Sequence, residues 1–327
     1  MSVYTTVEET ELQEFLSHYQ LGQLVACQGI SAGIENTNYF VTTTQGQFVL
    51  TLFEQYSYEE LPYFLELMAY LNENQVPSAH PCPDNEGHYL RYLNGKPAAL
   101  VQRLRGKEMR QPTVEQCAVL GQELGHLHVV GCDFPHYRAN QRGPSWWHGT
   151  GKRLLPYLQG ADAALLRSEL RFQYGYSAID LPRGVIHADL FRDNALFEGD
   201  KLCGIIDFYY ACHDVLLYDV AVTVNDWCSL PDGELDKVRM NALLEGYQEQ
   251  RPFTDEERRA WGVMLRAAAL RFWVSRLKDL HFPRAGEMTH TKNPNEYRDI
   301  LKTRLDISPL SRPTYIHPLQ NSAASLW

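Results

Sequence analysis

The chain has 327 residues, 44% of them hydrophobic and 21% charged, which is the composition of a globular protein. This length exceeds one ordinary hydrophobic core and predicts two lobes or domains. The formal net charge is −10, and residues 1–103 carry 12 Asp and Glu against three cations, Arg91, Lys96 and Arg103. An acidic half of this kind binds polyanions poorly, so we expect no nucleic-acid partner.

Targeting signals are not evident. No apolar run approaches the roughly 18 residues that span a bilayer, so we expect no membrane partner. The N-terminus lacks the basic and apolar segments of a secretory signal. The seven cysteines include no C-x-x-C pair, which argues against a disulfide framework and a zinc site. A cytoplasmic protein with reduced thiols is expected.

The first elements along the chain read as a helix within residues 7–20 and then as strand, turn and strand over residues 24–42. Gly29, Ser31 and Gly33 lie at the turn, where backbone N–H groups can approach phosphates closely. Any hairpin may use glycine in this way, so the turn is a weak signal by itself.

A third strand is predicted over residues 47–53 by alternation and β-propensity. Protein kinases carry a phosphate-pairing lysine on the corresponding strand, but here the run is Leu50-Thr51-Leu52. Three explanations stay open. The glycine turn, magnesium and Arg192 could meet the phosphate charge, the nucleotide could sit differently, or the protein could be a silent pseudokinase.

A helix is expected over residues 59–74, followed by a loop at 77–83 and two strands at 88–93 and 98–104. Glu60 or Glu66 could orient a kinase site, although an exposed helix carboxylate explains each one better. The last strand leads into Arg105-Gly106, a candidate hinge. There the adenine edge would bond to backbone close to Gln102 and Leu104.

Residues 114–130 are expected to form a helix, residues 131–150 an aromatic-rich loop, and residues 154–174 an amphipathic helix interrupted near Gly160. His126 and His128 lie two residues apart on the first helix and therefore point to different faces. We interpret both as structural.

The most informative stretch is Val185–Phe197, followed by Gly204–Phe208. In it, His187, Asp189 and Asn194 form an H-x-D-x4-N pattern, and Asp207 ends a short apolar run. The spacing from Asp189 to Asn194 matches the protein-kinase catalytic loop, in which the Asp takes the hydroxyl proton and the Asn binds magnesium. Asp207 takes the place of the second metal carboxylate. The apolar flanks predict short buried strands that hold these groups at a loop.

Residues 216–227 are predicted to form a helix with Asp219 near its start, where the carboxylate could accept backbone N–H bonds and brace the catalytic loop. Further polar or aromatic positions lie on otherwise apolar helices. They could contact a zwitterionic substrate or simply pack: Asn225, Asp226, Trp227, Trp273 and Arg276. Helices are expected to continue to about Arg304, before an irregular tail that begins at Asp306.

The catalytic stretch, from Ile186 to Phe197 and from Gly204 to Cys212, resembles the aminoglycoside-phosphotransferase and choline-kinase superfamily. More narrowly, the chain is similar to the bacterial homoserine kinases of that superfamily. Five further stretches carry this resemblance: Ser2–Thr5, Gly33–Val41, Phe48–Glu54, Tyr218–Cys228 and Arg271–Leu277. The absence of the strand lysine is also a trait of that family.

The resemblance implies an α+β, bilobal, protein-kinase-like fold, with an N-terminal nucleotide-binding lobe at 1–104 and a helical C-terminal lobe at 105–327. It implies ATP and Mg²⁺ as cofactors and L-homoserine as the small-molecule substrate. Asp189 would be the base, His187 its support, and Asn194 and Asp207 the magnesium ligands. Nucleotide contacts are expected at Gly29, Ser31, Gly33, Asn36, Asn38, Gln102 and Leu104. Substrate contacts are expected among Arg192, Tyr209, Asp226, Trp227 and Arg276.

Two alternatives stay open. The same chemistry could serve choline, a sugar, methylthioribose or an aminoglycoside. A quaternary ammonium calls for an aromatic and acidic cage, whereas homoserine needs separate partners for its carboxylate and its ammonium, and the sequence offers candidates for either. The chain could also be a catalytically silent nucleotide-binding module. That interpretation leaves the presence of Asp189 unexplained.

Overall fold

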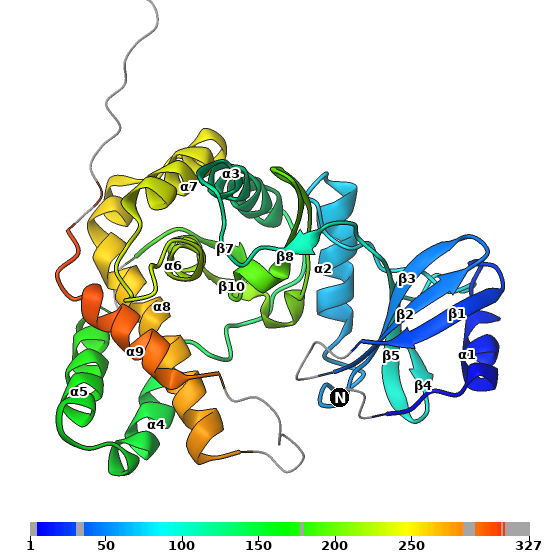
Figure 1. The fold of residues 1–327 in the computed structure, drawn as a ribbon, viewed down its shortest axis with the longest axis horizontal. Coiled ribbons are helices and arrows are strands. Elements are labelled where there is room, and N and C mark those ends of the chain that lie inside the picture. The colour runs from blue at the N-terminus through cyan, green and yellow to red at the C-terminus, as the bar shows by residue number, and fades with distance from the viewer. Residues whose placement is uncertain (1–4, 31–35, 177–179, 284–291, 309, 311–327) are drawn as a thin grey trace, which may run out of the picture.

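The computed structural model describes residues 5–30, 36–176, 180–283, 292–308 and 310. Within them, the chain forms a smaller lobe built on an antiparallel sheet and a larger, mainly helical lobe (Figure 1). The expected α+β, bilobal architecture is confirmed.

The smaller lobe is a five-stranded sheet in the order β1-β2-β3-β5-β4. Helix α1 (Glu9–Leu16) covers one face, and buried and half-buried residues alternate along β2, as expected for a sheet with one covered face. The other face is turned towards the larger lobe (Figure 1). The strands are β1 (Leu24–Gly29), β2 (Thr37–Thr43), β3 (Gly46–Leu52), β4 (Arg91–Leu93) and β5 (Lys96–Gln102).

Helix α2 (Pro62–Glu73) belongs to both lobes. Phe64 packs in a cluster with Phe53 at the end of the sheet, whereas Met68 and Leu71 belong to the core of the larger lobe. The helix begins at Pro62, later than expected, because the fixed φ of proline suits the first helical position.

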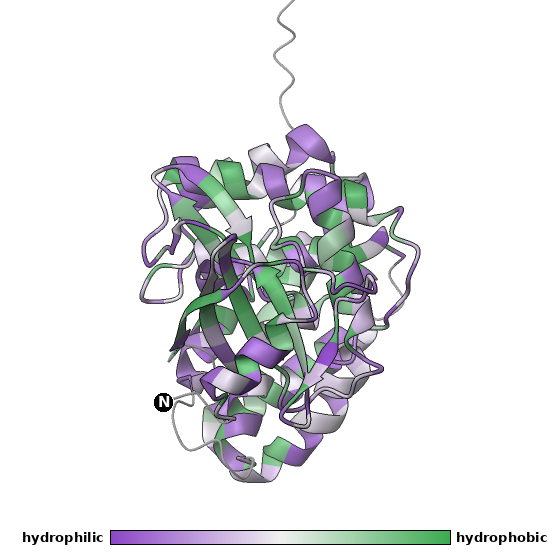
Figure 2. Cartoon of the chain, turned by 90° about the vertical axis from the view of Figure 1, so that its right-hand side faces the viewer, coloured by the Kyte–Doolittle hydropathy of each residue, from purple (hydrophilic) through white to green (hydrophobic). Residues whose placement is uncertain are grey.

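The larger lobe is arranged around helix α6 (Leu216–Trp227), which lies between the other helices in Figure 1. All of its residues are buried, and hydrophobic residues concentrate on the strands and inner helices (Figure 2). The surrounding helices are α3 (Val114–Gly131), α4 (Pro144–Leu154), α5 (Gly160–Gly175), α7 (Lys237–Gln250), α8 (Asp255–His281) and α9 (Pro294–Thr303).

The expected loop at 131–150 is wrong in its second half, because α4 begins at Pro144. Gly143 and Pro144 start the helix, and Trp147 is buried in the core. The aromatic residues are therefore part of a helical face that packs inward. A short 3₁₀ turn (η1, Leu155–Tyr157) then precedes Gly160, whose φ of +53° accompanies the expected interruption.

Two small sheets hold the loops between the lobes. Strand β7 (Arg183–Ile186) pairs with β10 (Cys212–Val215), and β8 (Ala195–Glu198) pairs with β9 (Lys201–Ile205) and with β6 (Lys107–Glu108). We propose that the lobes divide near Leu104, immediately before β6. In the described part of the chain, no helix has the length and apolar character needed to cross a membrane.

Candidate active site

The catalytic stretch connects two strand pairs at the edge of the larger lobe. Residues 187–194 join β7 to β8, and Asp207 follows β9. The register of β8 and β9 places Ala195 opposite Ile205, and the Ile206 amide donates to the Asn194 carbonyl at 3.0 Å. Pairing of two sequence-distant segments therefore brings Asn194 and Asp207 to the same end of one hairpin.

His187 ties this loop together. Its Nε2 lies 3.0 Å from the carbonyl oxygen of Ile206, and its Nδ1 lies 3.3 Å from the Asp189 amide. A carbonyl can only accept and an amide can only donate, so the ring is neutral with its proton on Nε2. Burial lowers the pKa of His187, in agreement with a neutral ring. His187 thus positions Asp189 rather than acting as an acid.

Asp189 is largely removed from solvent, with its side chain 18% exposed. Burial raises its pKa to about 6, an effect opposed by the positive charges of Arg271 and Lys292. Its Oδ1 lies 3.6 Å from Nη1 of Arg271. A buried carboxylate with a pKa near neutrality has the properties of a general base.

The side chains of Asn194 and Asp207 offer oxygen ligands. Asn194 donates its Nδ2–H to the Asp189 carbonyl at 2.8 Å, which leaves its amide oxygen as an acceptor. Asp207 adopts a left-handed backbone conformation with φ of +64°, which is unusual outside glycine and is often found at functional sites. Amide and carboxylate oxygens suit a hard cation such as Mg²⁺, so this pair fits the metal expected from the sequence.

The expected role of Asp219 in bracing the loop is confirmed. One carboxylate oxygen accepts the His187 amide and the other accepts the Ala188 amide, each at 2.7 Å. Burial alone would raise the pKa of Asp219, but hydrogen bonds from His128 and the loop lower it below its usual range. His128, which bridges Asp219 and the Tyr247 hydroxyl, is structural as expected.

On the smaller lobe, the expected nucleotide contacts lie on or beside the sheet face that is turned to the larger lobe. Asn38 and Thr51 pair across β2 and β3, and Thr51 donates its hydroxyl to Asn38 Oδ1 at 2.7 Å. Alternation along β3 places Thr51 on the sheet face where protein kinases carry their lysine. Gly29 ends β1, while Ser31 and Gly33 lie outside the described residues.

The expected hinge joins the lobes between β5 and β6. The Gln102 amide is already used by the His80 carbonyl, whereas the Leu104 amide has no hydrogen-bond partner among the described residues. Leu104 packs against Gly204 of β9, where an added Cβ would lie 2.1 Å from its side chain. Leu104 thus lies where the chain passes from the smaller lobe to the larger one.

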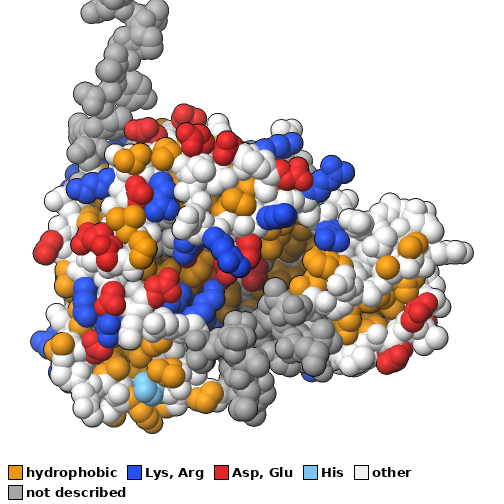
Figure 3. All heavy atoms as spheres, in the orientation of Figure 1, with side chains coloured by type: hydrophobic (Ala, Val, Ile, Leu, Met, Phe, Trp, Pro, Cys, Tyr) orange, Lys and Arg blue, Asp and Glu red, His pale blue; other side chains and the backbone are white. Residues whose placement is uncertain are grey.

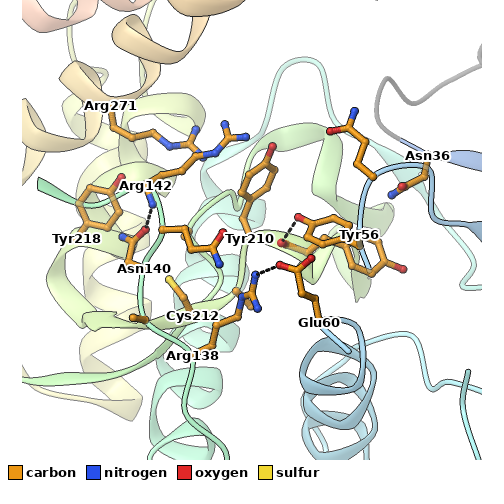
Figure 4. Close-up of a pocket in the computed structure, with 16 residues that line it drawn as sticks. Asn36, Tyr56, Glu60, Arg138, Asn140, Arg142, Tyr210, Cys212, Tyr218 and Arg271 are labelled. Atoms are coloured by element: carbon orange, nitrogen blue, oxygen red, sulfur yellow. Dashed lines mark hydrogen bonds and ion pairs between the residues drawn. The ribbon is translucent and has the colours of Figure 1, made fainter. Parts of the chain in front are cut away.

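A cavity of about 220 Å³ opens beside the catalytic loop, in the hollow between the lobes (Figures 3 and 4). It is lined by Ala188 of the catalytic loop and by Tyr209, an expected substrate contact. The other polar residues that line it were not anticipated from the sequence as substrate contacts. The expected loop at 131–150 supplies several of them, and its basic residues were the available signal. The polar residues that line the cavity, besides Tyr209, are Asn36, Gln55, Tyr56, Glu60, Arg138, Asn140, Gln141, Arg142, Tyr210, Tyr218 and Arg271.

The remaining expected substrate contacts lie elsewhere. Arg192 and Asp226 form an ion pair, with Nε 3.0 Å from Oδ2. Trp227 is fully buried and donates its indole N–H to the Leu190 carbonyl, so the structure does not bring it to the cavity. Arg276 pairs with Glu296 on α9. Asp226, Trp227 and Arg276 thus have partners on neighbouring segments, which explains their presence on otherwise apolar helices.

Comparison with known proteins identifies the family of the chain. Residues 26–253 match the model of the phosphotransferase enzyme family. The homoserine kinase of Methylobacillus flagellatus is 52% identical over 92% of this chain and 95% of its own, and that of Paraburkholderia xenovorans is 48% identical over 93% and 96%. A solved structure of an amicoumacin kinase in complex with AMP-PNP and Ca²⁺ has a TM-score of 0.70 at 13% identity, covering 91% of this chain and 92% of that one. At this level of identity, the likeness shows a shared fold alone. The chain therefore belongs to the phosphotransferase enzyme family and, within it, to the homoserine kinases.

Proposed function

We propose that this protein transfers the γ-phosphoryl group of ATP to the side-chain hydroxyl of L-homoserine. The observation that carries the proposal is the position of Asp189, a largely buried carboxylate with a pKa of about 6 that lies 3.6 Å from Arg271, one of the residues lining a polar cavity. Asn194 and Asp207 lie at the same end of the adjoining hairpin. The choice of acceptor is supported by the relatives that carry the name homoserine kinase.

In the proposed reaction, Asp189 accepts the proton of the acceptor hydroxyl as the oxygen forms its bond to the γ-phosphorus. The bond from the γ-phosphorus to the bridging oxygen breaks, and ADP leaves. His187 and Asn194 hold Asp189 through its amide and its carbonyl. A bound Mg²⁺ would supply neutralisation of phosphate charge, and we assign Asn194 and Asp207 as its ligands.

We propose that the nucleotide lies against the inner face of the smaller lobe. Gly29 and Asn38 would face its phosphates, with Ser31 and Gly33, and Asn36 would lie where the phosphates meet the acceptor cavity. Gln102 and Leu104 would present the backbone to adenine. Thr51, in place of the kinase lysine, provides a hydrogen-bonding group without charge, so more of the charge neutralisation falls to the larger lobe.

Steady-state phosphorylation with ATP and Mg²⁺ tests the proposal. The acceptors are L-homoserine, L-serine, L-threonine, choline, N-acetylglucosamine, methylthioribose and kanamycin. We expect L-homoserine to lead in kcat/KM by orders of magnitude, and Asp189→Asn to lose about 10²–10⁴-fold in kcat while it still binds ATP. Preference for another acceptor, with the same variant effect, would overturn the substrate and keep the chemistry. ATP binding without turnover of any acceptor would instead favour the silent module.

A further inference from the structure

The cavity beside Asp189 has an uneven distribution of charge. Among its lining residues, the charged side chains are Arg138, Arg142, Arg271 and Glu60. Arg138 and Glu60 form an ion pair with an N–O distance of 3.3 Å at one end of the cavity (Figure 4). Arg142 and Arg271 lie at the other end, close to the catalytic loop, so positive charge is concentrated beside the reacting groups.

Aromatic rings hold these two arginines in place. The guanidinium carbons of Arg142 and Arg271 lie 4.6 Å and 5.3 Å from the centre of the same ring, that of Tyr210. Arg271 is also 3.8 Å from the ring centre of Phe272. Contacts of this type use the faces of the planar group, whereas its N–H donors lie at the edge. Two oriented guanidinium groups are therefore preorganised for a planar anion.

The two like charges are held close to each other in a partly dehydrated site. The side chain of Arg271 is 5% exposed, and its Nη1 lies 3.6 Å from Oδ1 of Asp189. Both arginines lower the pKa of Asp189, which places Arg142 within electrostatic reach of the base as well. A carboxylate bound at this end of the cavity would offset the positive charge of the two arginines and accept hydrogen bonds from the guanidinium edges.

We propose that Arg142 and Arg271 bind the α-carboxylate of the acceptor and so select an amino acid over an amino alcohol. The proposal rests on the proposed function, and it names the groups that set acceptor specificity. In L-homoserine a chain of three carbons separates the hydroxyl oxygen from the carboxylate. Arg271 touches Asp189 and lines the cavity, so one small molecule can place its hydroxyl at Asp189 and its carboxylate at the arginines.

The test compares L-homoserine with 3-aminopropan-1-ol, the same molecule with hydrogen in place of the carboxylate. In the wild type we expect kcat/KM to favour L-homoserine by about 10³-fold. Arg142→Gln should lower kcat/KM for L-homoserine about 30- to 100-fold, mainly through KM. It should leave the value for 3-aminopropan-1-ol within about 3-fold. Arg142 is the better target because Arg271 also touches the base.

Two further variants separate recognition from folding. Arg142→Lys keeps the charge but loses the planar fork, so it should restore part of the preference. Arg153→Gln removes an exposed arginine of α4 and should change neither acceptor. Thermal melting of each variant, together with calorimetric titration of L-homoserine, shows whether a loss reflects binding.

The outcomes distinguish the two proposals. If Arg142→Gln lowers both acceptors equally, the carboxylate assignment is overturned while the proposed function stands. If L-serine proves the better substrate and Arg142→Gln abolishes its advantage over ethanolamine, the proposed acceptor fails and the carboxylate assignment stands. A wild type that prefers the amino alcohols overturns both.

Discussion

At the scale of single residues, Asp189 shows how burial sets reactivity. Removal from water destabilises the carboxylate and raises its pKa to about 6, and the positive charge of Arg271 opposes this without cancelling it. Because the folded-state pKa lies above the ordinary value of 3.8, ionisation of Asp189 lowers the stability of the folded protein as pH rises through that interval. The same burial that lowers stability gives Asp189 a pKa close to neutrality.

A pH profile follows from this pKa. The carboxylate form is the active one, so kcat/KM for L-homoserine should be constant above about pH 7 and should fall below about pH 6. Well below the pKa, kcat/KM should fall about ten-fold for each pH unit. Steady-state rates between pH 5 and 9 measure it, with binding of a non-hydrolysable ATP analogue over the same range as the control. A flat profile down to pH 5 would contradict the assignment of Asp189 as the base.

At the scale of elements, the central helix α6 positions the catalytic loop. A helix buried on all sides is expected to be apolar, yet α6 carries Asp219, Thr223, Asn225 and Asp226. Each has a partner: Asp219 holds the loop amides, Thr223 bonds to its own helix, Asn225 bonds to Arg304, and Asp226 holds Arg192. Polar residues on this helix therefore act as attachment points for other segments.

Replacement of Asp219 by asparagine tests this role. An amide group has one acceptor oxygen, so at least one of the loop amides would face a donor in a buried site. We expect a loss of about 2–4 kcal/mol in the free energy of unfolding and a clear fall in kcat. Urea denaturation measures the first. Asp236→Asn is the control, because Asp236 caps α7 at a more exposed site and asparagine caps equally well. Equal costs for the two variants would argue against the bracing role.

The hinge contains a glycine that the backbone requires. Gly106 has φ of +94°, and an added Cβ would meet the backbone of Phe197 at 3.0 Å. Gly106→Ala should therefore displace β6 from β8 and raise KM for ATP about 3- to 10-fold, with a loss of about 1–2 kcal/mol in stability. Gly199→Ala is the matched control, since Gly199 has φ of +60° and open space around it. It should lose stability without a change in KM, and a similar KM for both variants would contradict the hinge assignment.

At the scale of the whole molecule, the two lobes are connected beside Asp207, the proposed metal ligand. Tyr56, which follows β3, donates its hydroxyl to the Tyr209 carbonyl at 2.9 Å, and the Tyr209 hydroxyl shares a hydrogen bond with Thr51. Both contacts run from the smaller lobe to the turn that follows Asp207. Tyr56 and Thr51 of the smaller lobe thus take part in holding the lobes together.

Tyr56→Phe tests this connection. Loss of the hydrogen bond between the lobes should raise KM for ATP about 3- to 10-fold, because part of the binding free energy of the nucleotide is then used to order the lobes. Tyr58→Phe removes a hydroxyl that bonds to the Leu90 carbonyl within the smaller lobe, so it should cost similar stability and leave KM unchanged. Kinetics and thermal melting of the two variants decide the question. An equal effect on KM would show that the contact between the lobes has no special role.

Much of this architecture was predictable because it depends on local pattern. Hydrophobic alternation predicted the strands of the smaller lobe, and the H-x-D-x4-N spacing placed Asp189 and Asn194 on one loop. The helix containing Asp219 and the use of its carboxylate also followed from sequence, since an acid near a helix start accepts backbone amides. The start of α4 was missed because tryptophans in a stretch of Gly and Pro resemble a loop until their burial is known.

The acceptor cavity depends on the tertiary structure. Arg138 and Arg142 are more than a hundred residues from Arg271, and Glu60 lies on the other lobe, so no spacing in the sequence brings them together. The same holds for Arg192, Asp226 and Arg276, whose partners on neighbouring elements explain charges that looked available for a substrate. The sequence by itself determined the chemistry, because a catalytic loop is short and local. The packing of α4, α6 and α8 decided which charges meet in the cavity, because long-range contacts form only when the chain is folded.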